Sequence, residues 1–214
     1  MEDMTRLGHR LSAMAQNGLH YDDNPYAVER WQSLMQVAAA LLAGDVDGDR
    51  VADARDLAEV LASQAGHATP KVDVRGVCRD GAGRVLLVRE VSDGHWCLPG
   101  GWAEPHLSPS ASVVKEVAEE AGLAVDVDRL LGVFDRALAA GLQPHAFPVY
   151  KMFFACTVTG EVVRGDGLDE SETDAVDWFD LGDLPPLSRG RTHPDQLARI
   201  TPLLADPTLP AAFD

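Results

Sequence analysis

Three carboxylates are spaced so that a single helix could present them together. Glu116, Glu119 and Glu120 stand at positions i, i+3 and i+4, which lie on one side of an α-helix. Like charges at this spacing repel one another and destabilise an isolated helix. A divalent cation would remove the repulsion, and Mg²⁺ and Mn²⁺ prefer oxygen ligands of this kind. The spacing therefore predicts a metal site with these glutamates as ligands.

Acidic residues on a helix more often form a solvated face, so the flanking residues decide between the two interpretations. Gly100 and Gly101 precede the helix, and a double glycine lets the backbone approach a ligand and offer a carbonyl oxygen to a cation. Ser108 as N-cap and Pro109 in the first turn predict where the helix begins, and Gly122 predicts where it ends. This combination favours the metal site.

The composition argues against several classes of protein. The chain has 214 residues, of which 46% are hydrophobic and 24% charged, as is usual for a globular protein. Its net charge of −16 argues against general nucleic-acid binding, which requires a basic face. Because no apolar run could span a bilayer and the amino terminus does not resemble a signal peptide, we expect no membrane association and a cytoplasmic location.

The three cysteines are widely spaced, without a Cys-x-x-Cys motif, and this favours reduced thiols over a disulfide framework. Cys97 lies beside the double glycine, where a reactive thiol is conceivable. Its neighbours Trp96 and Leu98 instead predict a buried, inert thiol.

Residues 1–67 show helical spacing of hydrophobic residues and predict a small helical domain. We expect helices over 4–17, where Gly18 breaks the first, and over 24–42 and 52–64. The acidic segment 45–49 lies between the second and third helices. It lacks an EF-hand ligand at Ala43 and the closing glutamate at Ala54, so we interpret it as an acidic turn, not a calcium site.

From residue 70 the hydrophobic period changes from 3.6 to two, which predicts a second domain over 70–214. Strands are expected before and after a hairpin turn at 80–83, and then over 125–135, 150–158 and 175–179. A last helix is expected over 194–204. Strands surround the central helix instead of alternating with it, so we predict an α+β sandwich with helices packed on mixed sheets.

The glutamate helix and its preceding loop resemble the Nudix box, Gly-x5-Glu-x7-Arg-Glu-hydrophobic-x-Glu-Glu-x-Gly-hydrophobic, counted from Gly101. The positions that match are Glu116, Val117, Glu119, Glu120, Gly122 and Leu123. Leu107 stands where the box has its first Glu, and Lys115 stands where it has Arg; in the family these two residues commonly pair. The departures concern the support of the helix, whereas the three glutamates are retained.

The resemblance extends over most of the chain and indicates one subgroup, the Nudix hydrolases that cleave X-linked nucleoside diphosphates, with CDP-choline pyrophosphatase as best-known type. The segments that carry it are 16–21, 24–26, 29–31, 69–75, 96–103, 107–110, 113–117, 184–188 and 191–192. Leu107 and Lys115 are ordinary in that subgroup. Its usual Asp-Val-Gly is replaced here by Glu104-Pro105-His106, so we expect an altered substrate preference.

The resemblance implies a Nudix α/β/α sandwich with mixed sheets, preceded by a helical domain that mediates dimerisation; packing of the helices within one chain is the alternative. It implies Mg²⁺- or Mn²⁺-dependent hydrolysis of a nucleoside diphosphate linked to a moiety X, of CDP-choline or ADP-ribose type, giving a nucleoside monophosphate and phospho-X. Two other functions stay open. One is a sensor or interaction module that binds a nucleotide derivative without hydrolysing it, and the other is clearance of oxidised nucleoside triphosphates.

The resemblance also implies roles for individual residues. Glu116 and Glu120 are the first-choice metal ligands, followed by Glu119 and the Gly101 carbonyl. The attacking water would be oriented by Glu119 or by Glu172, in the loop before the last strand. The candidate substrate contacts, each of which also suits a structural or surface role, are Arg75, Trp102, Glu104, Arg136 and His145.

Overall fold

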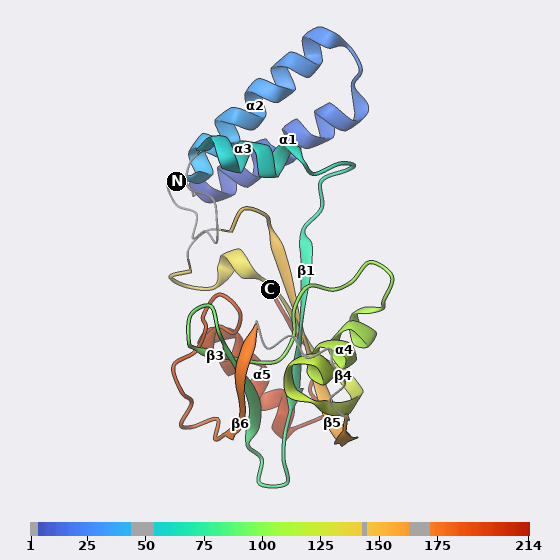
Figure 1. Ribbon diagram of the computed structural model, residues 1–214, viewed down its shortest axis with the longest axis vertical. Coiled ribbons are helices and arrows are strands. Elements are labelled where there is room, and N and C mark those ends of the chain that lie inside the picture. The colour runs from blue at the N-terminus through green and yellow to red at the C-terminus, as the bar shows by residue number, and fades with distance from the viewer. Residues whose placement is uncertain (1–3, 44–53, 143–144, 163–171) are drawn as a thin grey trace. The chain divides into compact units, whose positions relative to one another are not determined.

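The computed structural model describes residues 4–43, 54–142, 145–162 and 172–214 (Figure 1). The chain forms two compact units, Met1–Lys71 with Gly141–Val149, and Val72–Ala140 with Tyr150–Asp214. The segment Gly141–Val149 thus belongs with the helical unit, although it comes from the middle of the second domain expected from the sequence. The acidic turn predicted at 45–49 lies outside the described residues.

The first unit consists of helices α1 (Met4–Tyr21), α2 (Pro25–Ala43) and α3 (Ala54–Ala62), shown in blue to cyan in Figure 1. Asn24 caps α2, because its side-chain oxygen accepts a hydrogen bond from the Tyr26 N–H at 3.0 Å. The apolar faces of the three helices meet in a common core, formed by Ala15, Met35, Ala39, Leu42, Leu57 and Leu61. No helix in the described part of the chain is long and apolar enough to cross a membrane.

The prediction that Gly18 ends the first helix is wrong, because α1 continues to Tyr21. A Cβ atom at Gly18 would lie 2.2 Å from Cδ2 of Trp31 on α2. Gly8 is in a similar position, where a Cβ would lie 2.7 Å from Cγ of Leu42. Glycine inside a helix costs about 1 kcal/mol relative to alanine. Because Gly8 and Gly18 have no side chains, the large α2 side chains Leu42 and Trp31 pack directly against the α1 backbone.

The second unit contains two sheets. The larger has the strand order β1-β5-β4-β7 and the smaller β3-β2-β6. The strands are β1 (Lys71–Cys78), β2 (Val85–Glu90), β3 (Trp96–Cys97), β4 (Leu123–Asp135), β5 (Val149–Glu161), β6 (Thr173–Phe179) and β7 (Ala212–Phe213). Strand β4 pairs antiparallel with β5 and parallel with β7, so the larger sheet is mixed, as predicted.

Helices α4 (Pro109–Ala121) and α5 (Pro194–Ala205) cover opposite faces of the strands. Leu86 and Val88 of β2 pack in the same cluster as α4, whereas Val85 and Leu87 pack in the cluster that contains α5. Because successive side chains of a strand point to opposite faces, β2 is enclosed by helices on both sides. This arrangement confirms the predicted α/β/α sandwich.

The cysteines are buried free thiols, which agrees with the sequence prediction. Cys97 is completely buried, and its thiol donates to Oε1 of Glu90 at 3.1 Å. Burial raises the pKa of the Cys97 thiol well above its ordinary value, so the group stays protonated and unreactive.

Candidate active site on helix α4

The ends of α4 are where the sequence predicts them. The Ser108 hydroxyl accepts a hydrogen bond from the Ala111 N–H at 3.2 Å, and Pro109 occupies the first turn. Gly122 ends the helix with φ of 68°, a left-handed conformation that favours glycine. These caps fix the register of the helix and therefore which face each glutamate occupies.

Glu116 and Glu120 both lie against the double glycine. Oε2 of Glu120 accepts a hydrogen bond from the Gly100 N–H at 2.8 Å. A Cβ atom at Gly101 would lie 2.9 Å from Oε2 of Glu116, so the absence of a side chain there leaves room for this carboxylate. The two glutamates are one helical turn apart and converge on the same loop.

These two carboxylates are destabilised as anions. Burial raises the pKa of Glu120 to about 8, opposed by the positive charge of Arg75 and the Gly100 hydrogen bond and reinforced by the charge of Glu116. Burial also raises the pKa of Glu116, in spite of the nearby Arg75 and Lys115. A bound cation would stabilise both ionised forms, so the donor set fits a divalent metal.

Glu119 has a different partner. Its Oε2 lies 2.6 Å from Nζ of Lys115, and the same ammonium lies 3.0 Å from Oε1 of Glu104. Glu104 is also 3.0 Å from Nε2 of His106. Lys115 therefore connects Glu119 to the Glu104-Pro105-His106 segment, and the structure brings two of the three predicted ligands to the glycine loop.

Within the described ranges, no three His, Cys, Asp or Glu side chains are arranged so that they could hold a metal together. Mg²⁺ in phosphate-processing sites is commonly held by one or two carboxylates, with water and substrate oxygens completing its octahedron. Glu116 and Glu120 meet that requirement. The Gly101 carbonyl accepts from the Val74 N–H at 2.8 Å and has a second lone pair for a cation.

The glycine loop runs alongside β1 and is held by backbone hydrogen bonds. The Gly76 N–H donates to the Pro99 carbonyl at 2.8 Å, and the Ala103 N–H donates to the Val72 carbonyl at 2.9 Å. At Gly100, whose φ is 142°, a Cβ would lie 2.0 Å from the Val74 carbonyl oxygen. Only glycine permits so close an approach to the strand.

Two of the predicted substrate contacts, Arg75 on β1 and Trp102 beside it, differ in how far they are exposed to solvent. Arg75 is buried, with 3% of its surface exposed, and its guanidinium is bonded to Asp73 and to the Leu98 carbonyl. The period-two pattern places Arg75 on the polar face of β1, and in the structure that face is covered at this position. Trp102 is 51% exposed beside Gly101, so it is a surface residue and not part of the core.

Glu172 is exposed, and its carbonyl accepts a hydrogen bond from the Val91 N–H at 2.9 Å. Its charge contributes to the raised pKa of Glu116, so this carboxylate lies within electrostatic reach of the α4 face. Arg136 begins the short 3₁₀ helix η1 (Arg136–Leu138) and is half-buried.

His145 is placed in the helical unit. Its Nδ1 accepts from the Phe147 N–H at 3.2 Å, and its carbonyl lies 2.6 Å from Nε2 of His9 on α1. Both hydrogen bonds are therefore made within the helical unit. His145 therefore belongs to the first unit, whereas the residues of α4 belong to the second.

Sequence reasoning missed Asp73 and Lys151. Both are buried next to Arg75, and Nζ of Lys151 donates to Oδ1 of Asp73 at 2.7 Å. The alternation of polar and apolar residues on β1 is typical of a strand with one solvated face. The period gives no signal that both faces are covered, and a partner 78 residues away cannot be inferred from spacing.

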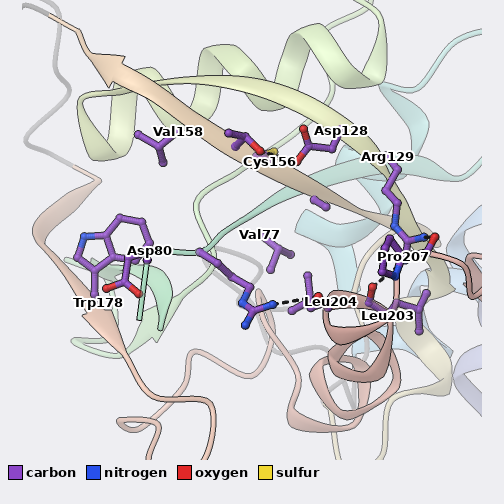
Figure 2. Close-up of a pocket in the computed structure, with 14 residues that line it drawn as sticks. Val77, Asp80, Asp128, Arg129, Cys156, Val158, Trp178, Leu203, Leu204 and Pro207 are labelled. Atoms are coloured by element: carbon purple, nitrogen blue, oxygen red, sulfur yellow. Dashed lines mark hydrogen bonds between the residues drawn. The ribbon is translucent and has the colours of Figure 1, made fainter. Parts of the chain in front are cut away.

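A cavity of about 540 Å³ lies elsewhere in the second unit (Figure 2). Trp178 and Arg129 lie on opposite sides of it, and no predicted site residue lines it. Arg79 donates to the Leu204 carbonyl at 2.9 Å, and Arg129 donates to the Leu203 carbonyl at 2.8 Å. Both arginines thus satisfy the carboxyl-terminal end of α5, which indicates a structural role for this region.

The fold and the acidic helix have counterparts among known proteins. The sequence profile of the NUDIX domain matches residues 69–200, and that of the UDP-X-like, N-terminal oligomerisation domain matches residues 2–54. The Bacillus subtilis (strain 168) protein named "Putative ADP-ribose pyrophosphatase YjhB" is 37% identical over 206 residues, covering 96% of this chain and 94% of that protein.

Two crystal structures are similar over much or all of the chain. An ADP-ribose pyrophosphatase from Streptococcus suis 89-1591 gives a TM-score of 0.58 at 37% identity, covering 68% of this chain and 100% of that one. A UDP-X diphosphatase gives a TM-score of 0.59 at 27% identity, covering 99% of this chain and 98% of that one. The second structure therefore matches the helical unit as well as the sheets.

Proposed function

This chain belongs to the Nudix family and is a Nudix hydrolase, and from that premise we propose that it cleaves the diphosphate linkage of a nucleoside diphosphate joined to a second moiety X. The products would be a nucleoside monophosphate and phosphorylated X. ADP-ribose is the first compound to test, because two relatives at 37% identity carry ADP-ribose pyrophosphatase in their names. UDP-linked compounds follow, because the full-length structural relative is a UDP-X diphosphatase. CDP-choline completes the set.

The observation that carries the proposal is the convergence of Glu116 and Glu120 on the double glycine. Two carboxylates with raised pKa values beside an open backbone form a site for a hard cation. Nudix hydrolases generally use divalent metal ions, and we propose Mg²⁺ or Mn²⁺ here.

The bound ion would neutralise charge on the diphosphate and lower the pKa of a coordinated water. Glu116 and Glu120 would hold the ion, with the Gly101 carbonyl as a further ligand. Water orientation and removal of its proton would fall to Glu119 or Glu172. Lys115 holds Glu119 in the structure, whereas Glu172 is exposed near Glu116, so each carboxylate has a distinct argument in its favour.

The substrate contacts are proposed from exposure and charge. Trp102 presents half of its surface beside Gly101, where its indole could stack on the nucleobase. Arg136 carries a positive charge at the start of η1 that suits the diphosphate. The contact of Glu104 with Lys115 favours a supporting role for Glu104 over the substrate contact predicted from sequence.

The test is a product assay with ADP-ribose, UDP-glucose and CDP-choline in Mg²⁺ or Mn²⁺, with chromatographic separation of the nucleoside monophosphate. Glu120→Gln should reduce turnover by about 10²–10³-fold, since one carboxylate ligand is lost, while the circular dichroism spectrum stays unchanged. The exposed Glu161→Gln, at the end of β5, is the matched control and should retain activity. Tight binding of one compound without hydrolysis would instead favour the sensor hypothesis.

The helical unit supports a proposal about assembly. Its match to an oligomerisation domain indicates a homo-oligomer, and we propose a dimer. Tyr21 and Tyr26 are 70% and 77% exposed, so α1 and α2 leave aromatic surface for a second copy. Light scattering after size exclusion should give twice the mass of the chain, and a monomer at micromolar concentration would contradict the proposal.

A further inference from the structure

Three charged side chains form a buried ion network beneath the glycine loop. Oδ1 of Asp73 accepts from Nε of Arg75 at 3.0 Å and from Nζ of Lys151 at 2.7 Å, while Oδ2 accepts from Nη2 of Arg75 at 2.7 Å. Their side chains are 8%, 4% and 3% exposed, in the order Asp73, Arg75 and Lys151. Burial alone would raise the pKa of Asp73, but the two cations hold it below its ordinary value.

The network has one more positive than negative charge, and Arg75 interacts electrostatically with Glu120 on α4. Arg75 opposes the effect of burial on the pKa of both Glu116 and Glu120. The positive charge of Arg75 therefore acts on the two carboxylates that lie against the double glycine. Charges removed from water interact strongly, so this arrangement couples the network to α4.

Arg75 also bonds the loop directly. Its third donor, Nη1, reaches the Leu98 carbonyl at 3.1 Å. Its chain neighbours Val74 and Gly76 donate through their N–H groups to the carbonyls of Gly101 and Pro99, each at 2.8 Å. Arg75 is thus at the centre of the β1 segment that pairs with the loop, and its side chain joins that loop to the network.

We propose that the buried ion network is a clamp that fixes the 98–101 loop, and with it Gly100, whose N–H bonds Glu120, and Gly101, whose missing side chain leaves room for Glu116. Arg75 is then a positioning residue, in place of the substrate contact predicted from sequence. The inference rests on the proposed function in one respect, that these groups surround a metal ion.

The chemistry of the guanidinium supports this role. Two of its donors bind Asp73 as a fork and a third points to Leu98, so one rigid plane sets the direction from the network to the loop. A lysine has a single ammonium and cannot reproduce that geometry. A contribution to folding stability explains the presence of this network less well, because well-packed apolar side chains often replace a buried ion network without loss of stability.

The first test is Arg75→Lys in the full-length protein. We expect Mn²⁺ affinity, measured by calorimetry on metal-free protein, to fall at least tenfold. Amide exchange should become faster at Gly100, whose N–H bonds Glu120, and at Val74, whose N–H bonds Gly101. In turnover assays, the fold-decrease in kcat should be larger than the fold-change in KM.

The matched control is Arg84→Lys, because Arg84 makes a similar side-chain pair with Asp80 on the surface at the 80–83 turn. It should leave Mn²⁺ affinity, amide exchange and kcat at wild-type values. An equal effect of both variants on metal affinity would overturn the clamp.

If Arg75→Lys does not fold, the triple variant Asp73→Leu/Arg75→Met/Lys151→Met provides the same test. Replacing the whole network should leave the urea midpoint close to that of the wild type, yet still weaken Mn²⁺ binding and speed exchange at Gly100. If wild-type metal affinity and exchange persist in a folded variant, the clamp is refuted. A rise in KM alone after Arg75→Lys would restore the role of substrate contact.

Neither metal affinity nor amide exchange requires a substrate. A wild-type protein that binds Mn²⁺ but hydrolyses none of the diphosphates would overturn the proposed function, and the variants would still decide the clamp. If the wild type binds no Mn²⁺, the metal site is refuted. If amide exchange at Gly100 is also the same in Arg75→Lys as in the wild type, the clamp is refuted as well.

Discussion

Lys115 donates to Glu104 over 3.0 Å and thereby joins helix α4 to the loop that follows the double glycine. The same ammonium lies 2.6 Å from Glu119, one turn further along the helix. Glu104 belongs to the segment in which the sequence departs from the subgroup pattern. This segment therefore provides the carboxylate that holds Lys115, whose ammonium also holds Glu119.

Loss of this bridge should affect catalysis more than folding. Lys115→Met is expected to lower kcat by about tenfold, a change of about 1.4 kcal/mol in the activation barrier, because Glu119 is no longer held. The pair is partly exposed, so the free energy of unfolding should change by less than about 1 kcal/mol. Steady-state kinetics and urea unfolding measure the two effects.

Lys115→Arg is the control for that prediction and should keep most of the activity, since arginine can bind both carboxylates. Full activity of Lys115→Met would show that Glu119 needs no support from this residue. Glu119→Gln and Glu172→Gln, assayed together, would then identify which carboxylate orients the water.

Mg²⁺ binding should release a proton near neutral pH. Burial raises the pKa of Glu120 to about 8, so the folded protein retains a proton that the unfolded chain, with its ordinary value of 4.5, has lost. The stabilising contribution of this proton is present below pH 4.5 and is lost as the pH rises through 8. Mg²⁺ affinity should increase over the same interval and level off above it.

Calorimetry in two buffers of different ionisation enthalpy measures that proton. Binding at pH 7 should release close to one proton in the wild type. Glu120→Gln should abolish the release, and a wild-type affinity that is constant between pH 6 and 8 would contradict the assignment of Glu120 as a ligand.

Removal of the Trp102 indole should weaken substrate binding. Aromatic stacking contributes about 0.5–1.5 kcal/mol, so Trp102→Ala should raise KM by about 2–10-fold, while Trp102→Phe should retain most of the affinity. Because the residue is 51% exposed, its replacement should leave the urea midpoint nearly unchanged. An unchanged KM for every tested nucleotide would remove Trp102 from the substrate site.

Gly18→Ala should destabilise the helical unit although alanine is the better helix former. The added Cβ would lie 2.2 Å from the Trp31 ring, and forced overpacking costs about 1–3 kcal/mol, more than the gain of up to about 1 kcal/mol in helix propensity. Gly81→Ala is the control, because nothing lies within 4 Å of its Cβ position. Thermal unfolding compares the two, and an increased Tm for Gly18→Ala would contradict the packing.

Elements governed by neighbouring residues were predicted well. The caps of α4, the turn at 80–83 and the strands β4, β5 and β6 depend on turn residues and hydrophobic period within a few positions of each other. The hairpin expected around that turn is wrong, because β1 and β2 belong to different sheets and are joined by an isolated bridge between Arg79 and Val85. Two-residue strands such as β3 and β7 have too few positions to show a period. They form because longer strands offer them hydrogen bonds, and sequence reasoning missed them.

The sequence by itself determined that one short helix is capped by Ser108 and Gly122 and carries three glutamates after a double glycine. These features depend on caps and spacing, whose physics is local. The tertiary structure decided which glutamates reach the loop, that Glu119 is bound to Lys115, and that Arg75 is buried with Asp73 and Lys151. Those outcomes depend on burial and on partners up to 78 residues apart, because a side chain's electrostatic environment is set by whatever packs around it.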